Sequence, residues 1–558
     1  MASVARAAPL KGGLVAPLSF LAVAFACVAA RSAYVTPWAI SALALAGAGL
    51  AASAASTVPS WLTLPVLGYA LLVVISTLLV SPAYAPAGLY QALLLALACG
   101  VAVRLSAREM RASVTSVVAL GAVLAAWGLL QVGPYGVARA RALFETPATY
   151  AAVINLLLIP VLALAIAGRR NAAVIGIGGL LSAAMLAADS RGGLVALAAG
   201  IGAAVILCMR VGRLQWRSVA LALAILAAGW ILAMALRTWP SHVVSAPTTA
   251  ANTESSVSRL ELYALSWSAW RDHALAGTGY LTFRYTLERG RAQVPSYGAS
   301  SDTWFVHNDY LQTLQELGPL GLVALLALAW LPVLVTYRKV ALVPEQRQLA
   351  AIAAASALTA MACHALVDFP FYVPVCLLLY GALLGVLDRQ LDLPRVALAP
   401  HWKSRPWYPA VRTAVALIAA LVLLRPVAAE AAAEWGLRRA AAGDAQTAAF
   451  WLGAARRIEP ADWRYHWYAG QFWDAQAAGS GRREAANLAA EAFTAGFNAN
   501  PLEVRNLLGK ISVQRHFRAL LDVPADRSML LAWVSRAEAL APLNPDVRRV
   551  REMLGTMK

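Results

Sequence analysis

Long apolar runs alternate with short polar segments along most of this chain. Each run approaches the roughly 20 residues that a helix needs to cross a bilayer. The runs are continuous, whereas the strands of a membrane barrel alternate every second residue over about ten residues. We therefore predict an all-α polytopic membrane protein with about 12–13 transmembrane helices. The thirteen predicted spans lie near 13–30, 37–54, 61–80, 87–103, 113–134, 147–167, 172–188, 193–209, 218–236, 318–336, 349–367, 370–387 and 410–428.

The Lys and Arg residues of the short loops predict the orientation of these spans, because cytoplasmic loops carry an excess of them. One side has Arg6, Lys11, Arg104, Arg108, Arg111, Arg169, Arg170, Arg210, Arg213, Arg217, Arg338, Lys339, Arg347, Arg389, Arg395, Lys403 and Arg405. The other side has only Arg31, Arg139, Arg141 and Arg191. We expect the first side to be cytoplasmic, which places both the long polar loop and the C-terminal tail outside the cytoplasm.

These boundaries divide the chain into four parts: an N-terminal bundle over 1–236, a loop over 237–317, further spans over 318–429 and a tail over 430–558. The tail is rich in Ala, Trp and charged residues, with helical patterning in Ala440–Ile458 and Arg482–Phe497. Three of its segments end in proline, at Pro460, Pro501 and Pro545. Such spacing is similar to tetratricopeptide helix pairs, whose period is about 34 residues. An ordinary helical bundle with proline-terminated helices is the alternative.

The composition agrees with a membrane protein and disfavours other classes. The chain is 60% hydrophobic with a mean hydropathy of +0.64. Its net charge of +18 lies largely in the short loops, so the positive-inside rule accounts for it and we expect no nucleic-acid partner. All five cysteines lie in apolar runs, and neither CxxC nor HExxH occurs, so we expect no disulfide, metal or other cofactor.

The most informative polar segment runs from His307 to Gly318, where the long loop meets a span. A histidine titrates near neutral pH, at about 6.5, which suits proton transfer. Asp302, Asp309 and Glu316 are near His307 in sequence. The spacing of these residues along the chain does not by itself predict a His–carboxylate pair.

Two further polar positions lie at span ends on the same predicted side. His364 and Asp368 are four residues apart and would share a helix face, either as a buried structural pair or in contact with substrate. Arg191 follows Asp189 and Ser190 between two spans. It could be an interfacial arginine that reaches for water, or an anion ligand, since a guanidinium holds phosphate through two hydrogen bonds.

The long loop contributes Arg259 and a segment over 260–270 with helical apolar spacing. We expect an interfacial helix there, with Trp267 and Trp270 as anchors, followed by a turn at Gly277–Gly279 that gives only weak evidence of phosphate binding. Because these arginines and histidines map to one face, a phosphorylated lipid handled without a metal is the expected substrate. Cations would stabilise a departing diphosphate.

Together these motifs resemble the O-antigen ligase superfamily, which includes Wzy-type O-antigen polymerases and bacterial O-oligosaccharyltransferases. The resemblance covers roughly 140–390. Its matching elements are Asp189-Ser190-Arg191-Gly192-Gly193, Arg259 with Trp267 and the Gly277-Thr278-Gly279 turn, His307-Asn308-x-Tyr310-Leu311 ending in Glu316-x-Gly318, and His364-x-Leu366-Val367-Asp368-Phe369. The His-Asn element is the most specific of these, and the Ser-Arg-Gly element is weak alone.

The resemblance implies a GT-C-like fold and an undecaprenyl-diphosphate-linked glycan donor at the periplasmic face of the bacterial inner membrane. It implies that Arg191 and Arg259 bind the diphosphate and that His307 deprotonates or orients the acceptor hydroxyl. It also places Asn308, Tyr310, Glu316, His364 and Asp368 at the substrate site.

The sequence leaves the acceptor open among lipid A–core, a second lipid-linked glycan and a protein hydroxyl. The tail could dock a protein acceptor or partner. A polysaccharide or lipid transporter is the alternative from another class. Transporters commonly show internal repeats and charged residues near the bilayer midplane, whereas this sequence shows no repeat between its halves and its charged residues map to one face. A scaffold that displays the tail would leave His307 unexplained.

Overall fold

The computed structural model of the chain describes residues 13–30, 34–52, 60–239, 256–295, 303–395 and 407–555. Arg6, Lys11, Arg31, Asp302, Lys403 and Arg405, named above, lie outside these ranges. Within the described ranges the chain is helical, with one isolated β-bridge between Ser60 and Arg395. All five cysteines are unpaired.

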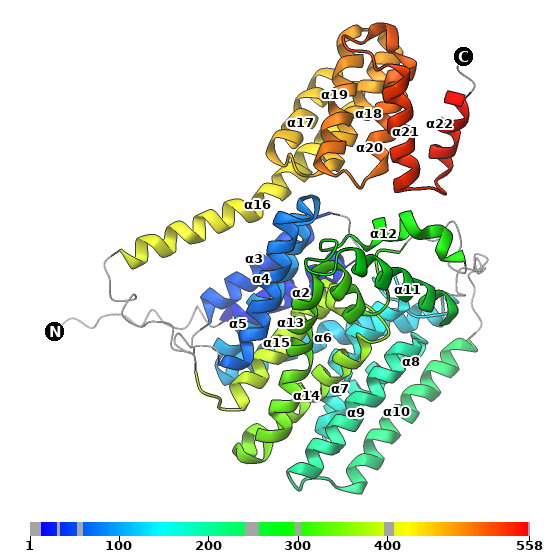
Figure 1. Cartoon of the computed structure of the whole chain (residues 1–558). Helices are drawn as coiled ribbons and strands as arrows, with labels where there is room; N and C mark the ends of the chain where they lie inside the picture. Colours follow the sequence, from blue (N-terminus) through cyan, green and yellow to red (C-terminus); the bar gives the residue numbers. More distant parts are fainter. Residues whose placement is uncertain are drawn as a thin grey trace, which may run out of the picture.

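A helix occupies each of the thirteen positions where the sequence predicts a span (Figure 1). They are α2 (Val15–Ala29), α3 (Thr36–Ala51), α4 (Leu64–Leu79), α5 (Ala85–Arg104), α6 (Ala107–Val132), α7 (Pro147–Ile166), α8 (Ala172–Ala187), α9 (Arg191–Arg210), α10 (Trp216–Arg237), α13 (Asp309–Lys339), α14 (Glu345–His364), α15 (Pro374–Gln390) and α16 (Tyr408–Ala441). Among the described residues, seven of these helices are long and apolar enough to cross a membrane, namely α4, α5, α6, α7, α9, α10 and α13. The shorter α2, α3 and α8 are also apolar. The chain is therefore a polytopic membrane protein, and the count of 12–13 spans stays a prediction.

Helix α14 shows why a helix of this bundle need not be strongly apolar. Its residues Ala351–Ala362 are buried, and it packs against α7, α9, α13 and α15. Most of these residues are small, so the neighbouring helices approach closely. Gly200 on α9 illustrates this, because a Cβ atom there would lie 3.1 Å from Ala360. Because protein surrounds α14, its composition is determined by packing against other helices more than by contact with lipid.

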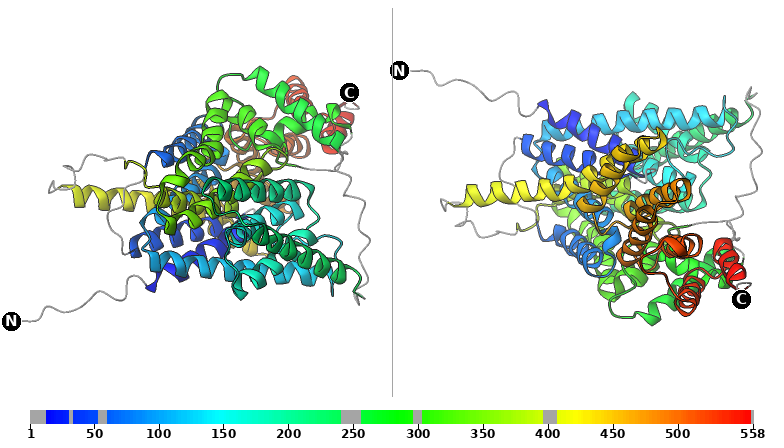
Figure 2. Two further views of the ribbon diagram at one scale, coloured as in Figure 1. Left: turned by 90° about the horizontal axis from the view of Figure 1, so that it is seen from below. Right: turned by 90° about the horizontal axis from the view of Figure 1, so that it is seen from above.

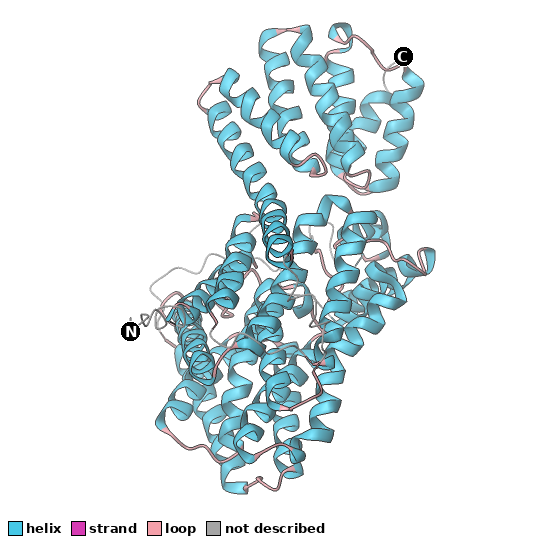
Figure 3. Cartoon of the chain, turned by 90° about the vertical axis from the view of Figure 1, so that its left-hand side faces the viewer, coloured by secondary structure: helices cyan, strands magenta, loops and turns pink. Residues whose placement is uncertain are grey.

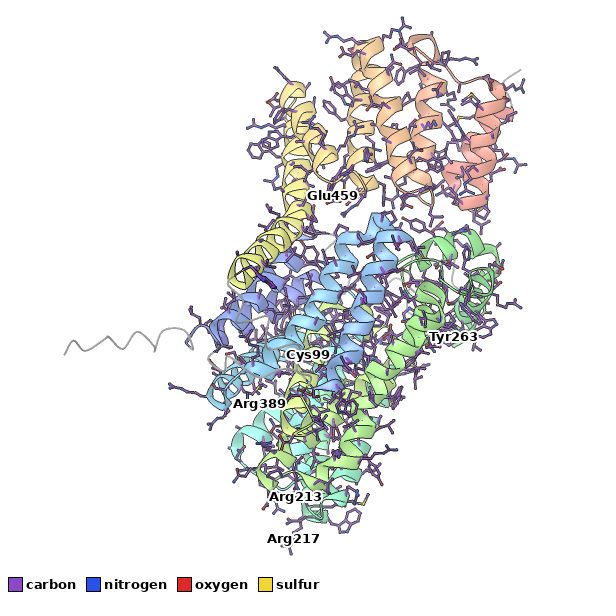
Figure 4. The ribbon with its side chains drawn as sticks, turned by 60° about the vertical axis from the view of Figure 1, so that its left-hand side comes forward. Cys99, Arg213, Arg217, Tyr263, Arg389 and Glu459 are labelled. Atoms are coloured by element: carbon purple, nitrogen blue, oxygen red, sulfur yellow. The ribbon has the colours of Figure 1, made fainter. Side chains whose placement is uncertain are left out.

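The candidate residues gather at one end of the bundle. There the backbone N–H of Asp309, at the start of α13, donates to the carbonyl of Ala365, just after α14, at 2.9 Å. Arg213 and Arg217 lie at the far end from Tyr263 (Figure 4). This far end is the one that the Lys and Arg distribution predicts to be cytoplasmic, and that orientation stays a prediction.

Two helices form in the long loop: α11 (Ser256–Asp272) and α12 (Phe283–Gly290). The first confirms the helix predicted over 260–270. Both contribute to a small apolar core with Leu262, Phe283 and Val306. The loop is therefore a folded cap on the bundle, and Val306 joins this core to the adjacent His307.

The C-terminal part forms a separate stack of helices, each packed against the next (Figures 1 and 3). These helices are α17 (Ala445–Ile458), α18 (Trp463–Ser480), α19 (Arg483–Ala499), α20 (Val504–His516), α21 (Arg527–Leu540) and α22 (Pro545–Gly555). Pro460 and Pro501 follow helices α17 and α19, as the sequence indicates, whereas Pro545 begins α22. Tetratricopeptide-type repeats remain a prediction.

Helix α16 joins this stack to the bundle, and its first half extends beyond the other helices in both views of Figure 2. Near its middle, the Glu430 carboxylate accepts hydrogen bonds from the backbone N–H groups of Val35 and Thr36, at 2.8 and 3.0 Å, and so caps α3. Arg425 forms two hydrogen bonds with Glu459, at 2.9 and 2.6 Å. These contacts attach the C-terminal helices to the bundle.

Candidate active site

His307 lies immediately before α13, and the Asn308 side chain caps that helix by accepting from the N–H of Leu311 at 3.0 Å. The backbone of His307 has φ = 60°, in the left-handed region that most side chains avoid. Its carbonyl accepts a hydrogen bond from the Tyr263 hydroxyl of α11 at 3.0 Å (Tyr263 is labelled in Figure 4). The loop core and the helix cap therefore hold His307 in a strained conformation.

A carboxylate from the turn after α14 meets the His307 ring. His307 Nδ1 lies 3.2 Å from Asp368 Oδ1, and both side chains are over 90% buried. His364 Nε2 lies 3.6 Å from Asp368 Oδ2. Asp368 is thus placed between two histidines. His364 and Asp368 are close, as their spacing suggested, but the predicted shared helix face is wrong, because α14 ends at His364 and Asp368 lies in the turn that follows.

Burial raises the pKa of the Asp368 carboxyl, but the hydrogen bond from His307 and the nearby His364 ring outweigh burial and hold this pKa below its ordinary value of 3.8. Asp368 is therefore a carboxylate at neutral pH. An ionised Asp368 accepts a hydrogen bond from the N–H at Nδ1 of His307, which leaves Nε2 as the unprotonated ring nitrogen.

Both predicted phosphate-binding arginines approach this turn. Arg259 of α11 donates from Nη1 to the carbonyl of Val367 at 3.1 Å. Arg191 is the first residue of α9, and its side chain is exposed. The next residue, Gly192, packs so closely that a Cβ atom there would lie 3.2 Å from His364 Nε2. The fold therefore brings together the four motifs that contain Arg191, Arg259, His307 and His364.

Two more arginines hold the junction before Arg191, and the sequence analysis gave neither a role at the site. Arg139 donates to the carbonyls of Ala188 and Asp189 at 3.2 and 2.8 Å. Arg237, at the end of α10, lies 3.9 Å from the Asp189 carboxylate. Asp189 itself has φ = 49°. This turn is therefore fixed by cations, which add positive charge beside Arg191.

The remaining predicted site residues have internal partners. The buried Tyr310 hydroxyl donates to the carbonyl of Ala362 at 2.9 Å. Glu316 is fully buried, and its carboxylate accepts four hydrogen bonds. The donors are Leu281 N, Phe283 N, Tyr372 Oη and Gln312 Nε2, at 2.9, 3.1, 2.9 and 3.1 Å. Substrate contact by Tyr310 or Glu316 stays a prediction, and here both residues join the loop, α13 and α14.

The Gly277–Gly279 turn also has an internal role. Its N–H groups at Thr278 and Gly279 donate to the carbonyls of Gln315 and Glu316 at 2.8 and 3.0 Å. Those carbonyls are available because α13 is interrupted at Gly318, where φ is 69° and ψ is −170°. The turn predicted from the two glycines is present, and these two of its amides bind α13.

An all-helical membrane protein with His, Asp and Arg side chains gathered at one end of its bundle has the features of an enzyme that acts at a membrane surface. Residues 176–326 match the family model described as O-antigen ligase. This match confirms, for that segment, the resemblance to the O-antigen ligase superfamily. It contains Arg191, Arg259 and His307, while His364 and Asp368 lie beyond it. No curated protein matches the chain. The domain supports, in general terms, a glycosyltransferase that uses a lipid-linked glycan.

Proposed function

We propose that this protein transfers or polymerises a glycan from an undecaprenyl-diphosphate donor onto an acceptor hydroxyl, at the periplasmic face of the bacterial inner membrane. The observation that carries the proposal is the His307–Asp368 pair beside Arg259 and the Arg191 junction. A base and a pair of cations in one place suit a reaction that removes a proton from an alcohol and releases a diphosphate.

In the proposed reaction, Nε2 of His307 takes the proton of the acceptor hydroxyl, while Asp368 orients the ring and stabilises the imidazolium. The acceptor oxygen bonds to the anomeric carbon as the bond from that carbon to the phosphate oxygen breaks, which inverts the configuration. The electron pair of that bond leaves with undecaprenyl diphosphate. Arg191 and Arg259 balance its negative charge, so the proposal requires no cofactor or metal.

Three acceptors fit this chemistry: a second lipid-linked glycan, the sugar of lipid A–core and a protein Ser or Thr. Support for a role of the C-terminal helices in acceptor choice comes from their attachment beside the loop. The Tyr285 hydroxyl of α12 accepts from Asn500 Nδ2 at 2.8 Å and lies 3.3 Å from Glu503. An acceptor held by these helices would lie on the same side as His307.

A transfer assay tests the proposal. The purified full-length protein would receive an undecaprenyl-diphosphate-linked oligosaccharide and, in separate reactions, lipid A–core, additional donor alone or a pilin-like protein. We expect a glycosylated product with one of these acceptors, lost in His307→Ala and retained in EDTA. Donor binding without transfer to any acceptor would contradict the proposal and favour a transporter. Loss of activity in EDTA would contradict metal independence.

A further inference from the structure

Asp309 is a fully buried carboxyl group next to His307 in sequence, and the proposed reaction gives it no role. Its Oδ2 atom accepts a hydrogen bond from the N–H of Phe371 at 2.8 Å, and its own N–H donates to the carbonyl of Ala365 at 2.9 Å. The partners of these two bonds, Ala365 and Phe371, precede and follow Asp368 in the chain. Asp309 therefore fixes the turn that carries Asp368 to the start of α13, where His307 lies.

The surroundings of Asp309 disfavour a negative charge. The titratable groups that face it are the carboxyls of Asp368 and Glu316 and, from α4 and the surrounding helices and turns, Tyr69, Tyr280, Tyr310, Tyr372 and Cys376. Asp368 is ionised in the proposed reaction. A second charge near it, taken out of water without a cation, would add the cost of desolvation to that of repulsion.

Three buried polar atoms beside one another lack hydrogen-bond partners among the described residues. They are Asp309 Oδ1, Thr313 Oγ1 and the Tyr69 hydroxyl oxygen. Thr313 follows Asp309 by one helical turn on α13, and Tyr69 faces both residues from α4. Oδ1 of Asp309 thus receives no hydrogen bond from any described residue, so an ionised Asp309 would lack the compensation that a buried carboxylate needs, whereas a neutral acid could also donate toward Thr313 or Tyr69.

We propose that Asp309 is a neutral carboxylic acid and a positioning residue for the His307–Asp368 pair. Its carbonyl oxygen holds Phe371, and its hydroxyl donates to the Thr313–Tyr69 side. It does not exchange protons with the substrate. The effect on catalysis rests on the proposed function, whereas the protonation state does not.

The test compares infrared difference spectra and transfer kinetics of the full-length protein and Asp309→Asn. An amide reproduces a neutral acid, since its oxygen can accept from Phe371 and its NH₂ group can donate to Thr313 or Tyr69. We expect a protonated-carboxyl band at neutral pH that disappears in Asp309→Asn but persists in Asp392→Asn, an exposed carboxylate at the opposite end. We also expect kcat of Asp309→Asn to stay within about threefold of wild type with an unchanged pH profile.

The infrared band and the transfer kinetics test separate parts of the proposal, so either can be contradicted without the other. Absence of the band from the wild-type protein would overturn the neutral state, whether or not the protein transfers glycan. A band together with loss of transfer in Asp309→Asn as severe as in Asp309→Ala would overturn the positioning role. If no variant and no wild-type preparation transferred glycan, the proposed function would fail, while the infrared band would still decide the state of Asp309.

Discussion

His307 Nδ1 and Asp368 Oδ1 lie 3.2 Å apart although the residues are 61 positions apart in the chain. The pair joins the last residues of the loop to the turn after α14. Because a carboxylate on one ring nitrogen sets the tautomer and so leaves the other nitrogen free to accept a proton, both residues should be needed for proton removal.

We expect His307→Ala to abolish glycan transfer while the protein still inserts and folds. Asp368→Asn should reduce kcat by about a hundred- to ten-thousand-fold, because the ring loses its negatively charged partner. His273→Ala, an exposed histidine of the same loop, is the matched control. Transfer assays with the purified variants measure both effects, and retained activity in His307→Ala would remove His307 from the mechanism.

The lowered pKa of Asp368 predicts a pH-dependent contribution to stability. A group whose pKa is lower in the folded state stabilises that state above its unfolded pKa, and the contribution disappears as the pH falls through the folded value. Asp368→Asn should therefore unfold more easily than wild type at pH 7, and the difference should shrink below the ordinary pKa of 3.8. Thermal unfolding in detergent measures this difference. If the difference in unfolding temperature between wild type and Asp368→Asn does not change with pH, the charge of Asp368 does not stabilise the fold.

Arg191→Lys should impair transfer by about tenfold or more, because an ammonium group cannot form the paired hydrogen bonds of a guanidinium with a diphosphate. Arg217→Lys provides the control, since Arg217 is exposed at the opposite end of the bundle (Figure 4). The KM for the lipid-linked donor and kcat should both be measured. If lysine serves as well as arginine at 191, the diphosphate role is wrong.

Deletion of 430–558 should alter acceptor choice more than donor cleavage. Asn500→Ala should have a weaker effect of the same kind, because it removes the hydrogen bond to Tyr285. Gln471→Ala, exposed in the same stack, is its control. Product analysis with a panel of acceptors, alongside hydrolysis of the donor, separates the two activities. An equal loss of both would make the C-terminal helices a folding element.

Much of the bundle could be predicted from the sequence, because each apolar run is long enough to specify a helix by itself. All thirteen runs became helices, and the α11 helix and the Gly277–Gly279 turn were also expected. Local patterns suffice for such elements. The number of helices that cross the membrane is harder to predict, since a helix such as α14 is surrounded by protein.

The His307–Asp368 pairing was beyond the sequence, unlike the closeness of His364 and Asp368. No spacing rule connects His307 with Asp368, and the nearby carboxyls of Asp309 and Glu316 turned out to face internal partners. The sequence indicated only a loop charge for Arg139 and no role for Arg237, because no local sequence pattern shows that the two arginines meet at Asp189. The family resemblance identified the motifs that form the site, and only the structure shows which of their residues are in contact.

The left-handed backbone of His307 lowers the stability of the fold, although the side chain at this position is needed for the proposed reaction. A side chain at φ = 60° costs about 1–2 kcal/mol that glycine would not incur. His307→Gly would regain this energy but would leave the buried Asp368 carboxylate without the hydrogen bond from His307, which costs more, so this variant should be inactive and also less stable than wild type. His307→Asn, whose side chain tolerates this backbone conformation and can still donate to Asp368, is the better inactive form for trapping the glycan donor intact for structure determination.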